Sequence, residues 1–334
     1  MQTGIRTAVV SRRDWLLSLP GLAIAPRVLA QERAAALRVS GLQHVTLAVT
    51  DVARSLDFYQ GLFGMPVQTR RDSTVLLRIG DRPLFLALTP TGERGPSIAR
   101  FGMAVEDFDV ERVAEVLSES GLVRDDDGPG AAVGPGRVRV TRRGDTPEVF
   151  VGDPNGLVVQ LQDRRYCGGN DPLGDVCVST EAAPARGALT TAGISHLTIS
   201  VPDPEGTNDF YQRSFGMDIQ AYQAASPLLG VGPGDDFLMF IDLGAPARVH
   251  HACLTVDRFS VEGVQTALES VGVRPRSEAG AGALRHWVSM RMPDRGGAPD
   301  GTPELYFSDP DGLPIQLQDP SYCGGGGYLG DVCA

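Results

Sequence analysis

The sequence predicts an α+β protein made of four tandem units, each with one strand, one helix and three further strands. One observation is a long repeat: the stretch Glu148–Gln162 returns as Glu304–Gln318, each reading as strand, Asp-Pro-x-Gly turn and strand. A second observation is that four strand-like runs each precede a helical pattern, and these runs are Leu42–Val49, Ile98–Val105, Ile194–Val201 and Val249–Val256. We therefore expect two modules, each a curved mixed sheet built from two βαβββ units.

The first unit shows the pattern most clearly. Its helix is expected over Val52–Phe63, because apolar residues recur on one face, and Gly64 is suited to end it. Strands are expected to follow over Thr74–Ile79 and Leu84–Leu88. The interval from His44 to His196 equals that from Tyr59 to Tyr211, which indicates a duplication.

The other units repeat this order. Helices are expected over Asp109–Ser120, around Asp209–Gln212 and over Ser260–Val271. Strands are expected over Arg137–Thr141, Glu148–Leu161, His286–Met292, Glu304–Ser308 and Leu313–Gln318. The predicted modules span residues 41–178 and 192–334, joined by a linker over residues 179–191.

The N-terminal residues 1–30 are predicted to be a twin-arginine signal peptide. Arg12 and Arg13 precede an apolar run, and Val28-Leu29-Ala30 resembles a cleavage site. The run is too short and too interrupted by proline for a membrane span, so no stable membrane insertion is expected. The prediction is therefore export to the periplasm or the extracellular space.

The net charge of the chain limits the classes of partner that it can bind. The chain has a formal net charge of −11, which argues against binding of nucleic acid or of an anionic membrane surface. A small-molecule substrate is the expected partner, and the sequence leaves open whether the chain forms a homodimer.

Four of the five cysteines form two evenly spaced pairs, Cys167 with Cys177 and Cys323 with Cys333. In an oxidising compartment each pair is expected to form a local disulfide that closes a glycine-rich loop. A thiolate metal site is the alternative, but no CxxC motif supports it. Cys253 remains and is expected to be a buried thiol.

The second module carries a candidate metal site. Its two opening strands contribute His196 and His251, and Gln316 adds an oxygen donor that can converge with them; Glu304 is an alternative carboxylate ligand. His250 should face the opposite side of its strand from His251. In the first module, Arg100 stands where a ligand would be needed, so this module, with His44 and Gln160 in its cavity, is expected to be non-catalytic.

The chain resembles the vicinal oxygen chelate superfamily, which includes glyoxalase I, bleomycin-resistance proteins and extradiol ring-cleavage dioxygenases. The resemblance rests on the βαβββ repeats, the helix ends Phe58-Tyr59 to Phe63-Gly64-Met65 and Phe210-Tyr211 to Phe215-Gly216-Met217, and the Asp-Pro-x-Gly turns. Two-module dioxygenases of this group hold iron or manganese in the second module through two His and one Glu. The resemblance therefore implies a divalent metal, Fe(II) or Mn(II) first and Zn(II) or Ni(II) next.

The resemblance also assigns a catalytic residue. The segment Leu305-Tyr306 followed by Asp309-Pro310 places Tyr306 at the family's catalytic tyrosine. Gln316 replaces the family's ligand Glu, and the family's His upstream of Leu305 is missing, so His286 is the substitute general acid or base. The expected function is an exported dioxygenase-type enzyme acting on a vicinal-oxygen substrate. A glyoxalase-like isomerase or lyase and a non-catalytic small-ligand-binding protein are the alternatives.

Overall fold

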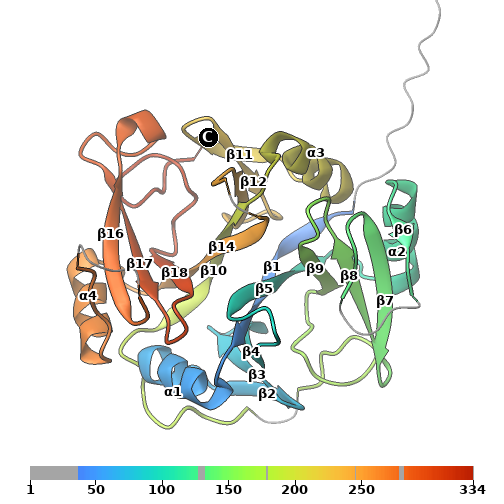
Figure 1. Cartoon of the computed structure of the whole chain (residues 1–334), viewed down its shortest axis with the longest axis horizontal. Coiled ribbons are helices and arrows are strands. Elements are labelled where there is room, and N and C mark those ends of the chain that lie inside the picture. The colour runs from blue at the N-terminus through green and yellow to red at the C-terminus, as the bar shows by residue number, and fades with distance from the viewer. Residues whose placement is uncertain (1–36, 127–131, 178–179, 245, 278–281, 334) are drawn as a thin grey trace, which may run out of the picture. The chain divides into compact units, whose positions relative to one another are not determined.

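The computed structural model describes residues 37–126, 132–177, 180–244, 246–277 and 282–333. The predicted signal peptide lies outside these residues. The described chain forms two nine-stranded mixed sheets with matching strand orders (Figure 1), β2-β3-β4-β1-β5-β9-β8-β7-β6 and β11-β12-β13-β10-β14-β18-β17-β16-β15. We refer to these sheets with their helices as the first and the second module. The predicted α+β architecture is confirmed.

The first module contains nine strands and two helices. The strands are β1 (Val39–Val49), β2 (Val67–Arg71), β3 (Thr74–Ile79), β4 (Leu84–Pro90), β5 (Ser97–Val105), β6 (Val123–Arg124), β7 (Arg137–Arg143), β8 (Thr146–Gly152) and β9 (Val158–Asp163). The helices are α1 (Val52–Phe63) and α2 (Val110–Glu119). Helix α1 has the predicted bounds because the Asp51 side chain accepts a hydrogen bond from the Arg54 backbone N–H and Gly64 closes it at a φ of 64°.

The second module repeats this arrangement. Its strands are β10 (Thr191–Ser200), β11 (Ile219–Gln223), β12 (Ser226–Gly230), β13 (Phe237–Ile241), β14 (Arg248–Val256), β15 (Arg274–Pro275), β16 (Arg285–Arg291), β17 (Thr302–Ser308) and β18 (Pro314–Gln318). Its helices are α3 (Pro204–Phe215), α4 (Val261–Ser270) and the short 3₁₀ turn η1 (Pro293–Arg295). The edge strands β2 and β11 were not predicted, because polar residues dominate them and hide the alternation.

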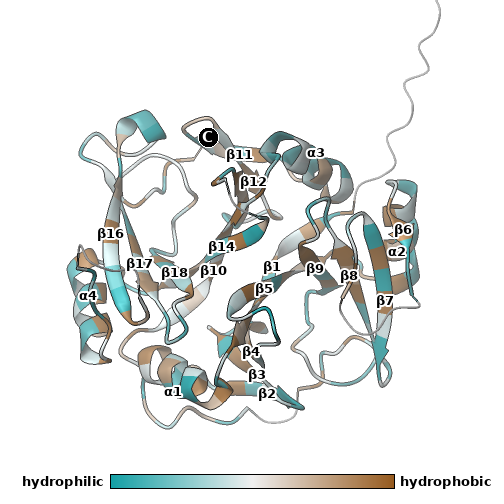
Figure 2. Ribbon diagram, in the orientation of Figure 1, coloured by the Kyte–Doolittle hydropathy of each residue, from teal (hydrophilic) through white to brown (hydrophobic). Residues whose placement is uncertain are grey.

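The apolar core follows the central strands of both sheets. In Figure 2 strand β8 is largely brown, and all its residues are buried, whereas β7 alternates teal and brown and is partly exposed. No helix in the described part of the chain is long and apolar enough to cross a membrane.

The two modules contact each other through the motifs that repeat in the sequence. The Tyr59 hydroxyl of α1 lies 3.2 Å from Asp309, in the Asp-Pro-x-Gly turn of the second module. The Tyr211 hydroxyl of α3 lies 3.5 Å from Asp153, in the corresponding turn of the first module. All four side chains are buried. Each module therefore anchors a helix on the turn of the other.

Both predicted disulfides are present. Cys167 bonds Cys177 and Cys323 bonds Cys333, and each closes the loop that follows the last strand of its module. Cys253 is free and buried, as expected. The two bonds agree with an oxidising compartment.

Removing the Cys323–Cys333 bond should destabilise the protein. Replacing both residues by Ser is expected to lower the free energy of unfolding by about 2–3 kcal/mol, because the loop gains entropy in the unfolded chain. Urea denaturation under oxidising conditions would measure this. The Cys167→Ser/Cys177→Ser pair has the same sequence separation of 10 and should lose a similar amount. An unchanged urea midpoint for both double variants would contradict the prediction.

Candidate metal centre

Three predicted ligands converge on one face of the second sheet. His196 lies on β10, His251 on β14 and Gln316 on β18, and these three strands are neighbours. His196 Nε2 lies 3.2 Å from Gln316 Oε1, and the rings of His196 and His251 are 5.5 Å apart between centroids. The His251 Nε2 and Gln316 Nε2 atoms are buried without a hydrogen-bond partner among the described residues. Of these two atoms only His251 Nε2 can ligate a metal, because Gln316 Nε2 belongs to an amide N–H group.

The prediction for His250 was wrong. The pairing of β10 with β14 is shifted between His251 and Val249, so His250 occupies a β-bulge. The bulge brings His250 Nδ1 within 2.9 Å of His251 Nδ1 instead of turning it to the opposite face. Strict alternation along a strand fails at a bulge, and the sequence carries no signal for this one.

Burial keeps the imidazoles neutral. Burial lowers the pKa of His196 to about 3, and burial and the nearby imidazoles hold the pKa of His251 well below its usual value. Burial also lowers the pKa of His250. Neutral imidazole is the form that binds a divalent metal, so both predicted His ligands are in the right protonation state at neutral pH.

Tyr306 lies beside this cluster. It pairs directly with Gln316 across β17 and β18, and its ring is 5.2 Å from that of His251. Its hydroxyl donates a 3.1 Å hydrogen bond to Glu304. Burial and the Glu304 carboxylate raise the pKa of Tyr306 well above its usual value, so the hydroxyl stays protonated and acts as a donor.

The alternative ligand Glu304 is already engaged. Its carboxylate forms a buried ion pair with Arg291 at 2.9 Å and also accepts hydrogen bonds from Tyr306 and Tyr322. A metal would have to compete with the Arg291 cation for this carboxylate. Glu304 is therefore less available to a metal than the predicted alternative, Gln316.

Tyr322 is a residue of this site that sequence reasoning missed. It belongs to the tail before the Cys323–Cys333 loop, and its buried ring lies 5.4 Å from that of His196. Phe237 stacks on the same imidazole at 4.3 Å. The repeated Tyr-Cys-Gly-Gly motif could have indicated this role, but its position over the sheet depends on how the tail folds back.

His286 is not brought to the cluster. Its Nε2 lies 3.3 Å from Glu269 on α4, whereas its neighbour Trp287 stacks on Tyr306 at 5.4 Å. Adjacent residues of β16 thus face opposite sides of the sheet, and His286 is on the side of α4.

The first module has the same framework without the second imidazole. His44 stacks on Phe85 at 4.5 Å, and Gln160 and Tyr166 lie close by. Arg100 pairs with Thr46 where His251 pairs with Thr198, and its guanidinium lies 6.0 Å from the centre of the Phe150 ring. The expectation that a cation stands in this place agrees with the structure.

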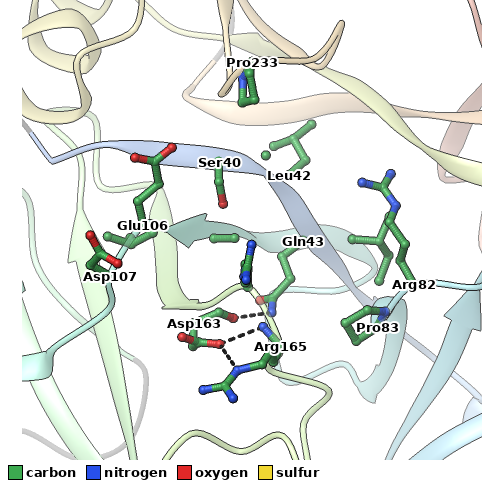
Figure 3. A pocket seen from close by; sticks show the side chains of 15 residues that line it. Ser40, Leu42, Gln43, Arg82, Pro83, Glu106, Asp107, Asp163, Arg165 and Pro233 are labelled. Atoms are coloured by element: carbon green, nitrogen blue, oxygen red, sulfur yellow. Dashed lines mark hydrogen bonds and ion pairs between the residues drawn. The ribbon is translucent and has the colours of Figure 1, made fainter.

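Cavities adjoin both modules. One cavity of about 410 Å³ is lined by His250, which contacts His251, and by Trp287, which stacks on Tyr306. It therefore lies next to the candidate metal centre. A larger cavity of about 710 Å³ in the first module is shown in Figure 3. Arg82 and Arg165 line it together with Glu106, Asp107 and Asp163, and Arg165 pairs with Asp163 at 3.1 Å. Its charges largely balance one another.

The side chains at this centre can form a metal site only if Gln316 is counted as a ligand. Within the described residues, no three His, Cys, Asp or Glu side chains are placed to share a metal ion. Two imidazole nitrogens and the Gln316 oxygen nevertheless converge, and the orphaned His251 Nε2 lacks any other partner. This set fits a divalent transition metal that accepts mixed nitrogen and oxygen ligands.

The fold consists of two similar modules with matching strand orders. Residues 41–161 match the family described as Glyoxalase/Bleomycin resistance protein/Dioxygenase superfamily. The first module is therefore similar to this superfamily in sequence.

Individual relatives are distant. A probable chloroplastic lactoylglutathione lyase of Arabidopsis thaliana is 24% identical over 58% of this chain, which spans about half of that relative (51%). The Mn(II)-bound glyoxalase from Novosphingobium aromaticivorans has a TM-score of 0.59 and 15% identity, over 84% of this chain and 82% of that one. An extradiol ring-cleaving dioxygenase from B. fuscum has a TM-score of 0.59 and 17% identity, over 86% and 74%. These structures are similar in fold.

Proposed function

We propose that the protein is an exported, metal-dependent enzyme whose active centre lies in the second module. The observation that carries this proposal is the convergence of His196, His251 and Gln316, with both imidazoles neutral and the His251 Nε2 unsatisfied. These three residues would hold the metal, Fe(II) or Mn(II) first and Zn(II) or Ni(II) as alternatives. A metal bound there would supply Lewis-acid polarisation and a template for the substrate.

The residues around the centre suggest the reaction. Tyr306 keeps its proton and can donate a hydrogen bond or proton to a substrate oxygen, while Glu304 orients its hydroxyl. The cavity lined by His250 and Trp287 gives a small molecule a place near the centre, where Trp287 separates it from Tyr306. We propose a substrate with two adjacent oxygen atoms, such as a catechol-like aromatic, and ring cleavage of the dioxygenase type.

Metal content is the decisive measurement. The mature protein, purified after export, is expected to contain nearly one equivalent of metal, and the His196→Ala/His251→Ala double variant should lose at least nine-tenths of it. His286→Gln is a matched control, because this buried imidazole faces α4 and not the cluster. A double variant that retains its metal and its fold would refute the proposed centre.

The metal and the use of oxygen distinguish the remaining candidates. Iron or manganese with substrate-dependent oxygen uptake supports the dioxygenase. Zinc or nickel with turnover and no oxygen uptake supports the glyoxalase-like isomerase or lyase. A folded protein that stays metal-free after reconstitution supports the non-catalytic small-ligand-binding protein. In that case the contacts of Tyr322 and Phe237 with His196 would belong to the packing of the sheet.

A further inference from the structure

A second candidate site lies in the first module, away from the metal centre. A cavity of about 420 Å³ is formed by the segment that joins β4 to β5, by the turn between β8 and β9, and by Ala247 and Arg248 of the second module. This volume is in the range of cavities that hold small organic ligands.

The charged residues that line this cavity in the described part of the chain are all basic. Three arginines line it, Arg94, Arg100 and Arg248, and none of the described residues that line it is acidic. The whole chain has a net charge of −11, so a purely cationic cavity is against the general trend of the sequence. The cavity in Figure 3 differs, because Glu106, Asp107 and Asp163 line it and Asp163 pairs with Arg165.

Arg100 is the central residue. Its Nε atom is buried and has no hydrogen-bond partner within the described part of the chain, nor does any described carboxylate form an ion pair with it. The nearby Glu148 is already bound to Arg71 at 2.9 Å, to Arg143 at 3.3 Å and to Tyr166 at 2.6 Å. A guanidinium cannot shed its proton, so Arg100 keeps its charge, and an anion bound in the cavity would supply the counter-ion that the described residues do not.

The rest of the lining is apolar or weakly polar. Ile98, Leu157 and Val158 contribute aliphatic surface, and Thr89, Thr91 and Ser97 contribute hydroxyl groups. We propose that this cavity binds a small organic carboxylate, whose anionic group pairs with Arg100 while its apolar body contacts the aliphatic residues. Arg94 and Arg248, which are exposed, add positive potential that attracts the anion. The site does not depend on the metal centre.

Benzoate is a suitable probe. Isothermal titration of the metal-free full chain with benzoate is expected to show saturable binding of one molecule. Arg100→Met should weaken the affinity at least tenfold, and Arg142→Met should leave it unchanged, because Arg142 is exposed and does not line the cavity. Arg248→Met replaces an exposed residue of the lining and so does not disturb the core. It should weaken the affinity for benzoate several-fold. Inorganic phosphate should bind at least tenfold more weakly than benzoate, since it has no apolar body.

Four results would overturn the inference. Three are the absence of saturable benzoate binding to the wild type, unchanged affinity in both Arg100→Met and Arg248→Met, and phosphate binding as tight as benzoate. The fourth is loss of benzoate binding in the metal-site double variant. The His196→Ala/His251→Ala variant should bind benzoate as the wild type does. Loss of binding in that variant would place the anion in the second module instead, and metal loss with intact benzoate binding would leave this site standing.

Discussion

Arg291→Met is expected to lower the free energy of unfolding by about 3–5 kcal/mol, because it leaves a buried carboxylate without its cation. Arg291 is fully buried and pairs with Glu304 at 2.9 Å. Its guanidinium also donates to the carbonyl oxygens of Gly296 and Gly325, which hold η1 and the disulfide loop against the sheet. Urea denaturation of oxidised protein would measure the loss.

The first module offers a matched comparison. Arg71 pairs with Glu148 in the equivalent network, but its side chain is 20% exposed and Arg143 remains as a second cation at 3.3 Å. Arg71→Met should therefore cost clearly less than Arg291→Met. The double variant Arg291→Met/Glu304→Leu should recover much of the stability, since it removes the stranded charge. Equal losses for the two arginines, with no recovery, would show that the buried pair is not the cause.

Asp236→Asn is expected to stabilise the protein above pH 7 and to have little effect near pH 4. Asp236 precedes β13 and accepts a 3.1 Å hydrogen bond from the Leu42 backbone N–H of the first module. Burial raises the pKa of Asp236 to about 7, opposed by Arg82 and reinforced by Asp235. The Asn side chain keeps an acceptor for Leu42 and carries no charge.

The sign of this effect follows from proton binding. Between the unfolded pKa, about 3.9, and the folded pKa of about 7, the folded protein binds more protons than the unfolded chain. The stability contributed by the protonated Asp236 is complete below the unfolded pKa and is lost as the pH rises through the folded pKa. At about 1.4 kcal/mol per pH unit the loss amounts to a few kcal/mol.

Chemical denaturation at pH 4.5, 6 and 8 would test this. The difference between Asp236→Asn and the wild type should grow across the series. Asp57→Asn is the control, because this exposed carboxylate lies on α1 and is not among the groups that shift the pKa of Asp236. A difference that stays constant from pH 4.5 to 8 would contradict the assigned pKa.

Much of the fold could be predicted from the sequence because its signals are local. Helix α1 has the predicted bounds, since the Asp51 side chain caps its first turn and Gly64 ends it at a positive φ. The disulfides could be predicted from the spacing of the cysteines together with the expected export to an oxidising compartment. The convergence of His196, His251 and Gln316 could be anticipated because the βαβββ order makes β10, β14 and β18 neighbours.

The remainder depends on contacts distant in the sequence. The bulge at His250 arises from a shift in pairing between two strands. Tyr322 approaches His196 only because the tail turns back over the sheet, and the Arg291–Glu304 pair needs two strands of defined register. His286 was assigned to the site by its residue type, although its position on β16 turns it toward α4.

The reciprocal contacts of Tyr59 with Asp309 and Tyr211 with Asp153 have a consequence for how the chain holds together. The interface resembles that of a two-fold symmetric dimer whose subunits have been joined end to end. The linker keeps the two modules at a high effective concentration, which favours the closed interface. We therefore expect the two modules to unfold together. A change in either Asp-Pro-x-Gly turn should also affect the helix of the other module that contacts it.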